Sequence, residues 1–220
     1  VLILHDRTRP PEEAIWYGFW GNLWVVDGRG VVYRAYPQAT ASPKDLQIAP
    51  AFSGSGDLTG DGLPELVTKV DNCGAHTCFS NFQIISQARG SLENIVAAPW
   101  TNEGQPGDVI SISFAEPRLE DENGDGRLDF LVHGGTIGSV GAGIMRPYTE
   151  VWRWDGTAVT LAHTQLDPTT YRHHYLYEAN DRMAAGDLDR AVFLYEEAIN
   201  NPNLETAAFL DTEAATKAAI

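Results

Sequence analysis

Two short acidic segments carry the side-chain types that bind hard cations. Both segments, 57–65 and 121–129, place an oxygen-bearing side chain at their first, third, fifth and ninth positions. In the first segment these residues are Asp57, Thr59, Asp61 and Glu65, and in the second they are Asp121, Asn123, Asp125 and Asp129. Calcium takes about six to eight oxygen ligands, and a tight turn can present alternate side chains around one ion. The spacing therefore predicts two calcium sites.

The backbone of both segments suits such a turn. Glycine occupies the fourth and sixth positions of each segment: Gly60, Gly62, Gly124 and Gly126. Glycine readily adopts the positive φ that folds a loop over a bound ion. The backbone carbonyl of the seventh residue, Leu63 or Arg127, would complete the near side of each site.

The segments differ from EF-hand loops, which need a bidentate glutamate at the twelfth position and a helix on each side. The twelfth position is Thr68 in one segment and Val132 in the other, and both follow apolar, strand-forming residues. A single segment rich in Asp, Asn and Gly is also typical of an ordinary turn. Two segments that agree at every liganding position favour metal binding over turn formation alone.

The strings DLTGDGLPELV and DENGDGRLDFLV resemble the calcium-loop repeats of the FG-GAP and VCBS type, found in integrin α-subunit propellers and in many secreted bacterial proteins. The resemblance covers about residues 50–135. It implies loops that link strands within propeller blades, with the ions holding the strand connections. A closed ring needs more blades than 220 residues can supply. We therefore expect propeller-blade-like antiparallel sheets in a partial or atypical propeller.

Short strands joined by turns must position these loops. Hairpins are predicted at 22–36, at 79–96 about Arg89-Gly90 and at 148–163 about Asp155-Gly156, with a further strand at 109–116. The 21 Gly and 12 Pro residues lie mostly between short apolar runs. The two loop-and-strand units form an internal repeat. These features predict a mainly β, calcium-binding domain over residues 1–168.

Residues 169–220 are predicted to be helical, because they are rich in Ala, Leu and Glu and their apolar residues recur at helical spacing. Gly186-Asp187 separates two antiparallel helices, Pro202 ends the second, and a third is expected from Leu204 onward. One predicted apolar face holds Leu176, Ala179, Met183 and Ala184. The next holds Leu188, Ala191, Val192, Tyr195, Ala198 and Ile199.

The segment YLYEANDRMAAGDLDRAVFLYEEAINNPN is similar to a single tetratricopeptide repeat. The matching residues are Ala179, Gly186, Asp187, Leu188, Ala191, Tyr195, Ala198 and Pro202. The resemblance implies a helical hairpin in which small residues allow close packing. Because a lone repeat cannot bury its apolar face, this one should dock on the β domain or be followed by further repeats.

Charge and composition narrow the class of partner. The net charge is −15, from 30 acidic and 15 basic residues, which disfavours a nucleic-acid partner. The sequence has no apolar run long enough to span a bilayer. It begins with Val1 and has no basic leader, so we expect a processed or cloned fragment, with any signal peptide or anchor lying outside it.

Cys73 and Cys78 are the only cysteines. Zinc would want four ligands, and His76 is the only nearby addition. A local disulfide is the favoured interpretation and indicates an oxidising compartment, while a reduced, inert pair is the alternative.

Other residues with possible chemistry have simpler explanations. Adjacent residues on a helix or strand point apart, so His173 and His174 are read as domain-junction packing. Trp152 and Trp154 alternate on a strand and favour core packing, although with Trp100 they could stack on a sugar. The sequence has neither a G-x-S-x-G nor an H-E-x-x-H motif, and its acidic pairs fall within the metal loops.

The sequence therefore predicts an extracellular or cell-surface, non-enzymatic module with two Ca²⁺ sites. We expect its partner to be another protein, bound through the helical tail or the β surface. The alternative hypothesis is a carbohydrate-binding or glycan-processing accessory domain. A hydrolase is a third hypothesis, and it would need convergent carboxylates that bind no metal.

Overall fold

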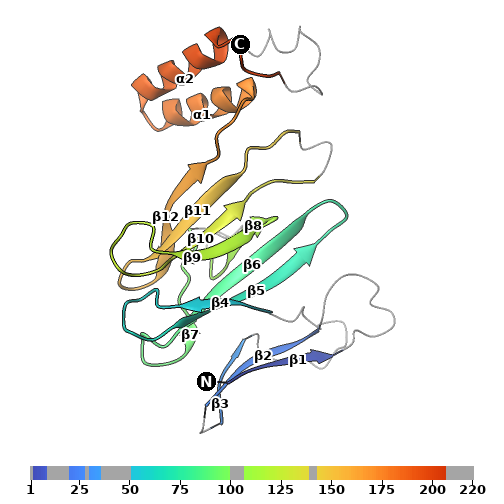
Figure 1. Ribbon diagram of the computed structural model, residues 1–220, viewed down its shortest axis with the longest axis vertical. Helices are drawn as coiled ribbons and strands as arrows, with labels where there is room; N and C mark the ends of the chain where they lie inside the picture. Colours follow the sequence, from blue (N-terminus) through green and yellow to red (C-terminus); the bar gives the residue numbers. More distant parts are fainter. Residues whose placement is uncertain are drawn as a thin grey trace. The chain divides into compact units, whose positions relative to one another are not determined.

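The computed structural model describes residues 2–8, 20–27, 30–35, 51–99, 107–138 and 143–206, the first three ranges by their backbone alone. The chain forms two compact units. One comprises Val1–Ile137 with Pro147–Gln165, and the other comprises Gly138–Arg146 with Leu166–Ile220. The described part is mainly β, with antiparallel sheets followed by two helices (Figure 1). The predicted fold class, mainly β with a C-terminal helical segment, is confirmed.

The first sheet has three antiparallel strands, β1 (Leu2–Thr8), β2 (Trp20–Asp27) and β3 (Gly30–Ala35). Strands β2 and β3 pair from Leu23↔Ala35 to Asp27↔Gly30. The hairpin predicted over 22–36 is therefore confirmed.

The second sheet is a meander of β4 (Ala51–Gly56), β5 (Glu65–Cys73), β6 (Cys78–Ser86) and the short β7 (Glu93–Asn94). A fifth strand, β8 (Ile110–Ser113), also pairs with β6. Strands β7 and β8 share the same edge of β6, because β7 pairs with its end and β8 with its beginning. The hairpin predicted about Arg89-Gly90 is present, with Gly90 at φ 90° in the turn.

The third sheet is a second four-stranded meander of β9 (Glu116–Glu120), β10 (Asp129–Gly134), β11 (Tyr148–Trp154) and β12 (Val159–Leu166). The hairpin predicted about Asp155-Gly156 joins β11 to β12. The strand predicted over 109–116 is present as β8 but ends early, because Phe114 adopts a φ of 49° and the chain turns there into β9. The predicted segment therefore contributes β8 to the second sheet and the first residue of β9 to the third.

The second and third sheets share one hydrophobic core. It joins Phe82 of β6 to Phe130 of β10, whose rings meet edge to face with centroids 5.2 Å apart. Trp152 of β11 is buried in this core and Trp154 packs against it. The predicted core packing of both tryptophans is confirmed. Trp152, at 3% exposed, presents no ring face to solvent, whereas Trp154 is only partly buried.

The helical unit contains α1 (Arg172–Ala184) and α2 (Leu188–Asn200), which lie side by side (Figure 1). Gly186, at φ 81°, ends the first helix. The Asp187 side chain then caps the second by accepting a hydrogen bond from the Arg190 N–H. The predicted break at Gly186-Asp187 is confirmed.

The predicted apolar faces of the helices are only partly right. The buried residues are His174 and Ala179 of α1 and Ala191, Leu194 and Ala198 of α2. Met183, Leu188, Val192 and Ile199 are instead about half exposed. Three alanines, Leu194 and His174 are therefore buried in the hairpin, and the other large apolar residues of these predicted faces are exposed or partly exposed.

The segment after α2 is not helical at its start. Glu205 pairs with Tyr171 in an isolated parallel bridge, and residues 204 and 206 belong to no helix or strand. The remainder of the third helix predicted from Leu204 lies outside the described residues. No helix in the described ranges is long and apolar enough to cross a membrane.

Candidate functional site

The two acidic loops occupy equivalent places in the second and third sheets. The first loop joins β4 to β5 and is closed by the pair Gly56↔Glu65. The second joins β9 to β10 and is closed by the pair Glu120↔Asp129. Each loop thus connects the first two strands of a four-stranded meander, and the ninth residue of each loop begins the second strand.

The backbone of the two loops repeats as well. The four loop glycines all have positive φ: Gly60 at 78°, Gly62 at 83°, Gly124 at 74° and Gly126 at 87°. Side-chain-bearing residues pay a steric cost in this region, which explains why glycine stands at the fourth and sixth positions of both loops.

The first aspartate of each loop binds backbone N–H groups of its own turn. Asp57 Oδ1 accepts from Gly60 N–H at 2.7 Å and Oδ2 accepts from Gly62 N–H at 3.0 Å. In the second loop Asp121 Oδ1 accepts from Asp125 N–H at 3.0 Å and Oδ2 accepts from Gly126 N–H at 2.9 Å. Each carboxylate oxygen carries two lone pairs, so one N–H bond leaves it able to accept a cation.

The fifth residues also match. Asp61 Oδ1 accepts from Leu63 N–H at 2.8 Å, and Asp125 Oδ1 accepts from Arg127 N–H at 2.9 Å. The Arg127 N–H bond, followed by side-chain bonds from Asn123 and Arg127, lowers the pKa of Asp125 to about 2. The Asp125 carboxylate is therefore favoured over its protonated form more strongly than an ordinary aspartate is.

The ninth residue of the first loop is a buried acceptor. Glu65 is only 1% exposed. Its Oε2 accepts from the N–H groups of Leu58 (2.8 Å) and Thr59 (3.1 Å), and its Oε1 accepts from the hydroxyl groups of Ser86 (2.8 Å) and Thr59 (3.4 Å). These hydrogen bonds compensate for burying the carboxylate, and they tie the loop to its own closing strand.

The ninth residue of the second loop is held by an ion pair. Asp129 is 2% exposed. Its two oxygens accept from Nε and Nη2 of Arg153, each at 2.9 Å. Arg153 Nη2 also reaches Glu122 at 3.0 Å. Sequence reasoning missed Arg153, because its position opposite Asp129 follows only from the register of β10 on β11, in which Phe130 pairs with Trp152.

The two loops touch each other. Leu128 N–H of the second loop donates to the carbonyl of Asp57 in the first, at 3.1 Å. A Cβ at Gly60 would lie 2.7 Å from Cδ of Arg127, and one at Gly56 would lie 2.5 Å from a methyl carbon of Leu128. Leu58 is buried in the core beneath the first loop. The loops are thus neighbours, which their separation in the sequence does not reveal.

The chemistry of the donors fits calcium better than their present arrangement does. Carboxylate, amide and hydroxyl oxygens on glycine turns are the ligand type that calcium takes. Among the described residues, however, no three His, Cys, Asp or Glu side chains are grouped so as to hold a metal ion. The ninth residues, Glu65 and Asp129, do not join such a group, because protein hydrogen-bond donors already occupy the oxygens of both carboxylates. The first, third and fifth side chains and the seventh carbonyl remain as the donor set, but Asp125 offers only Oδ1, because its Oδ2 accepts from Nδ2 of Asn123 and from Nη2 of Arg127, at 3.0 and 3.1 Å.

The predicted disulfide between Cys73 and Cys78 is present. It joins directly opposed residues at the end of the β5–β6 ladder that lies away from the first acidic loop. Its sulfur atoms are therefore not zinc ligands.

The histidine pair departs from expectation. His173 and His174 do not point apart, because their ring centroids are 4.1 Å apart and both rings donate through Nε2–H to the Ile144 carbonyl, at 3.1 and 2.8 Å. His174 Nδ1 accepts from the Thr169 hydroxyl at 2.7 Å. Burial lowers the pKa of His174, and the charges of His173 and Arg146 lower it further. The hydrogen bond to the Ile144 carbonyl raises it, but by less than burial lowers it. Both nitrogens of His174 and Nε2 of His173 are thus used in structural hydrogen bonds.

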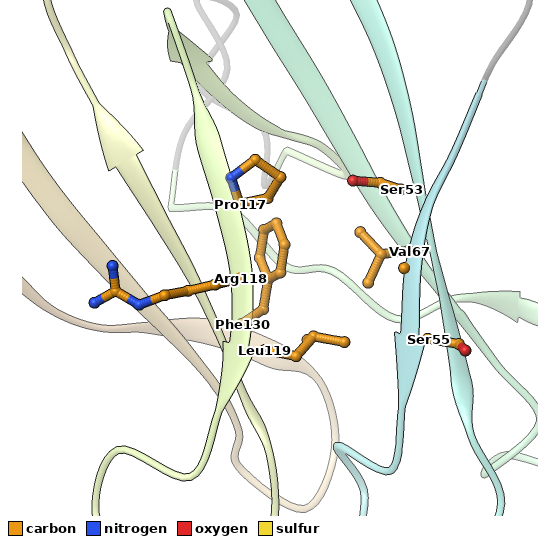
Figure 2. A pocket seen from close by; sticks show the side chains of 8 residues that line it. Ser53, Ser55, Val67, Pro117, Arg118, Leu119 and Phe130 are labelled. Carbon is orange, nitrogen blue, oxygen red and sulfur yellow. The ribbon is translucent and has the colours of Figure 1, made fainter.

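A pocket of about 210 Å³ lies between β4 and β9, the facing edge strands of the two meanders. Figure 2 shows Val67, Leu119 and Phe130 directed into the space between the sheets, while the guanidinium of Arg118 points away from it. Ser53 and Ser55 supply the hydroxyl groups of the lining. None of the residues that line this pocket carries a carboxylate or an imidazole, so it offers no acid–base pair for hydrolysis.

The acidic loops are the candidate site on geometric grounds alone. Comparison of the chain with protein families, with curated proteins and with solved structures gives no match.

Proposed function

We propose that this protein is a non-enzymatic module that binds two calcium ions, one in each acidic loop. The observation that supports the proposal is the repetition of one loop design in two separate hairpins. Both loops share glycine turns at the fourth and sixth positions, the bond from the sixth N–H to the first aspartate, the bond from the seventh N–H to the fifth aspartate, and the place within the meander. Ordinary turn chemistry needs none of these to agree between two loops.

The first ion would be held by Asp57, Thr59, Asp61 and the Leu63 carbonyl, and the second by Asp121, Asn123, Asp125 and the Arg127 carbonyl. Glu65 and Asp129 would act mainly as buried supports of their loops, and Asp129 would become a ligand only by releasing Arg153. Calcium supplies a fixed positive charge that offsets the repulsion among these acids. The chain's own residues supply the turn, the oxygens and the anchoring hydrogen bonds.

An extracellular location agrees with this function. Disulfides persist in oxidising compartments, and extracellular calcium modules work at dissociation constants of about 0.1–1 mM. The surface acidity and the outward-facing apolar residues of the helices support a role in binding another protein. No contact in the described residues favours a glycan, since Trp152 and Trp154 belong to the core and Trp100 lies outside the described residues.

Thermal unfolding with calcium and with chelator tests the proposal. At about 1 mM calcium and a dissociation constant of about 0.1 mM, each ion would add roughly 1.4 kcal/mol to the free energy of unfolding. We expect the melting temperature to rise with calcium, and the paired variant Asp61→Asn with Asp125→Asn to lose most of the rise.

Asp155→Asn is the matched control. Asp155 also binds two N–H groups of its own turn, at 2.7 and 2.9 Å, but it stands in a hairpin with no second acid. It should leave the calcium effect intact. A melting temperature that calcium does not change in the parent chain would overturn the proposal.

A further inference from the structure

Helix α2 exposes a straight row of apolar side chains. Leu188, Val192 and Ile199 are 60%, 55% and 53% exposed, and the half-buried Tyr195 completes the row between Val192 and Ile199. Successive members are separated by four, three and four residues, so all four lie on one side of the helix.

This row lies beside the face that holds the hairpin together, and Tyr195 belongs to both, because its hydroxyl donates to Oδ1 of Asn180 in α1 at 2.5 Å. The contact with α1 is made by Ala191, Leu194 and Ala198 of α2, all at most 1% exposed. The hairpin has therefore already buried one apolar face, and the row is a second one. Exposed single apolar residues need no explanation, but a continuous row along one helix marks an interaction site.

The spacing of the row is that of a coiled-coil seam. With Leu188 and Tyr195 at d positions, Val192 and Ile199 fall at a positions, where β-branched residues suit a two-helix contact. A groove of this kind accepts the apolar face of another amphipathic helix.

Charges beside the seam define the chemistry of that helix. The adjoining e positions are Asp189 and Glu196, both exposed. Within the described ranges neither carboxylate has an ion pair or a side-chain hydrogen bond. The basic residue of α2, Arg190, is engaged in its own hairpin, 3.8 Å from Glu178 and 4.9 Å from the centre of the Phe193 ring.

A second copy of α2 would not complement these acids. An antiparallel copy would place Asp189 against Glu196 of its mate, and a parallel copy would bring no base to either residue. A helix with Lys or Arg beside its apolar seam would pair with both acids and exclude like-charged partners.

We propose that the exposed α2 row is a docking surface for a basic amphipathic helix of a partner protein. The inference specifies the protein-interaction part of the proposed function and is independent of calcium binding. Helix α2 spans only about 20 Å, so the contact would be small and weak, as in transient complexes.

The test uses the full 220-residue chain and two synthetic helical peptides about three heptads long. Both peptides carry Leu and Ile at a and d positions; one has Lys and the other Glu at the flanking positions. Fluorescence anisotropy at low ionic strength should show the Lys peptide binding at least about tenfold more tightly than the Glu peptide, with the difference shrinking as salt screens the charges.

Two sets of variants locate the surface. Val192→Ser combined with Ile199→Ser should weaken binding of the Lys peptide at least about tenfold. Asp189→Asn combined with Glu196→Gln should remove the preference for Lys. Phe52→Ser, at a similarly exposed residue of β4, should change neither. Circular dichroism melting confirms that each variant is folded, and removing calcium should leave peptide binding unchanged.

Three results would overturn the inference. The first is that neither peptide binds, or that both bind equally well. Another is a dimer in sedimentation that Val192→Ser and Ile199→Ser dissolve, which assigns the row to a second copy of the chain. The last is peptide binding that appears only after residues 207–220 are removed, which assigns the row to the chain's own C-terminal segment.

Discussion

Arg153 holds both oxygens of the buried Asp129 carboxylate, and this makes it an internal competitor for any cation that the second loop binds. The first loop has no such competitor, because Glu65 is satisfied by neutral N–H and hydroxyl donors. The two sites should therefore differ in affinity even though their sequences match. An ion that reaches Asp129 must first displace a guanidinium group.

Replacing Arg153 with Gln tests this difference. Breaking a buried ion pair costs about 3–5 kcal/mol, and partial exposure of the Arg153 side chain (28%) reduces our expectation to about 1–3 kcal/mol without calcium. Calcium should then restore stability to Arg153→Gln more strongly than it stabilises the parent. Urea unfolding in chelator and in calcium measures both effects.

Arg118→Gln is the control for this experiment. Arg118 pairs with Glu120 at 3.1 Å, but both side chains are more than half exposed, so the loss should be below about 0.5 kcal/mol. A calcium response of Arg153→Gln equal to that of the parent would show that Arg153 does not compete with the ion.

At the scale of the loops, Gly60 and Gly124 form a natural matched pair. Both have a φ near 75° and both stand at the fourth position, but only Gly60 faces the other loop, where Arg127 would lie 2.7 Å from a Cβ. Alanine at either position should cost about 1 kcal/mol for its backbone conformation. Gly60→Ala should cost about 0.5–1 kcal/mol more because Arg127 must move. Equal losses in chemical denaturation would show that the contact between the loops contributes nothing.

In the helical unit, His174 should make stability depend on pH. Its pKa is lowered from 6.5, so the unfolded chain binds the proton more readily than the folded chain. Stability is complete above about pH 6.5 and falls as the pH drops from there toward the lower folded pKa. His174→Gln, which keeps a donor for the Ile144 carbonyl, should flatten this dependence. Helix ellipticity followed in urea at several pH values measures it, and an unchanged slope in His174→Gln would assign the effect elsewhere.

Local signals explain which elements could be predicted from the sequence. Asp155-Gly156, Gly186-Asp187 and the loop glycines dictate turns through their own backbone preferences, and the structure has a turn at each. The turn at Phe114 was not predicted, because a positive φ is rare for an aromatic residue and the neighbouring residues are not typical of a turn. The exposure of the apolar row on α2 was not predicted either, because apolar spacing identifies a helix face but does not show whether another element covers it.

At the scale of the whole molecule, the decisive contacts join residues far apart in sequence. Two of the three sheets are meanders that carry the same loop, and they share one core through Phe82 and Phe130. The hydrogen bond from Leu128 to Asp57 and the pairing of Arg153 with Asp129 depend on how those meanders assemble. Sequence patterns supplied the acidic residues but not their partners, because long-range register has no local signature.

The bond between Cys73 and Cys78 fixes how β5 and β6 align over their whole length. The same alignment carries the ladder back to Leu66↔Ile85 and then places Glu65 beside Ser86, where Ser86 donates to the carboxylate. A slip of one residue would turn every side chain of β5 to the opposite surface of the sheet and carry Glu65 out of the interior. The disulfide at one end of the β5–β6 hairpin thus helps to keep Glu65 buried at the other end.

Replacing both cysteines with Ser should therefore do more than remove about 2 kcal/mol of loop-closure stabilisation. We expect calcium titration to show weaker binding at the first loop and unchanged binding at the second. Equal weakening at both loops would point to general loosening of the domain. If the loops bind calcium as proposed, reduction of this one covalent bond would weaken one ion site and leave the other unchanged.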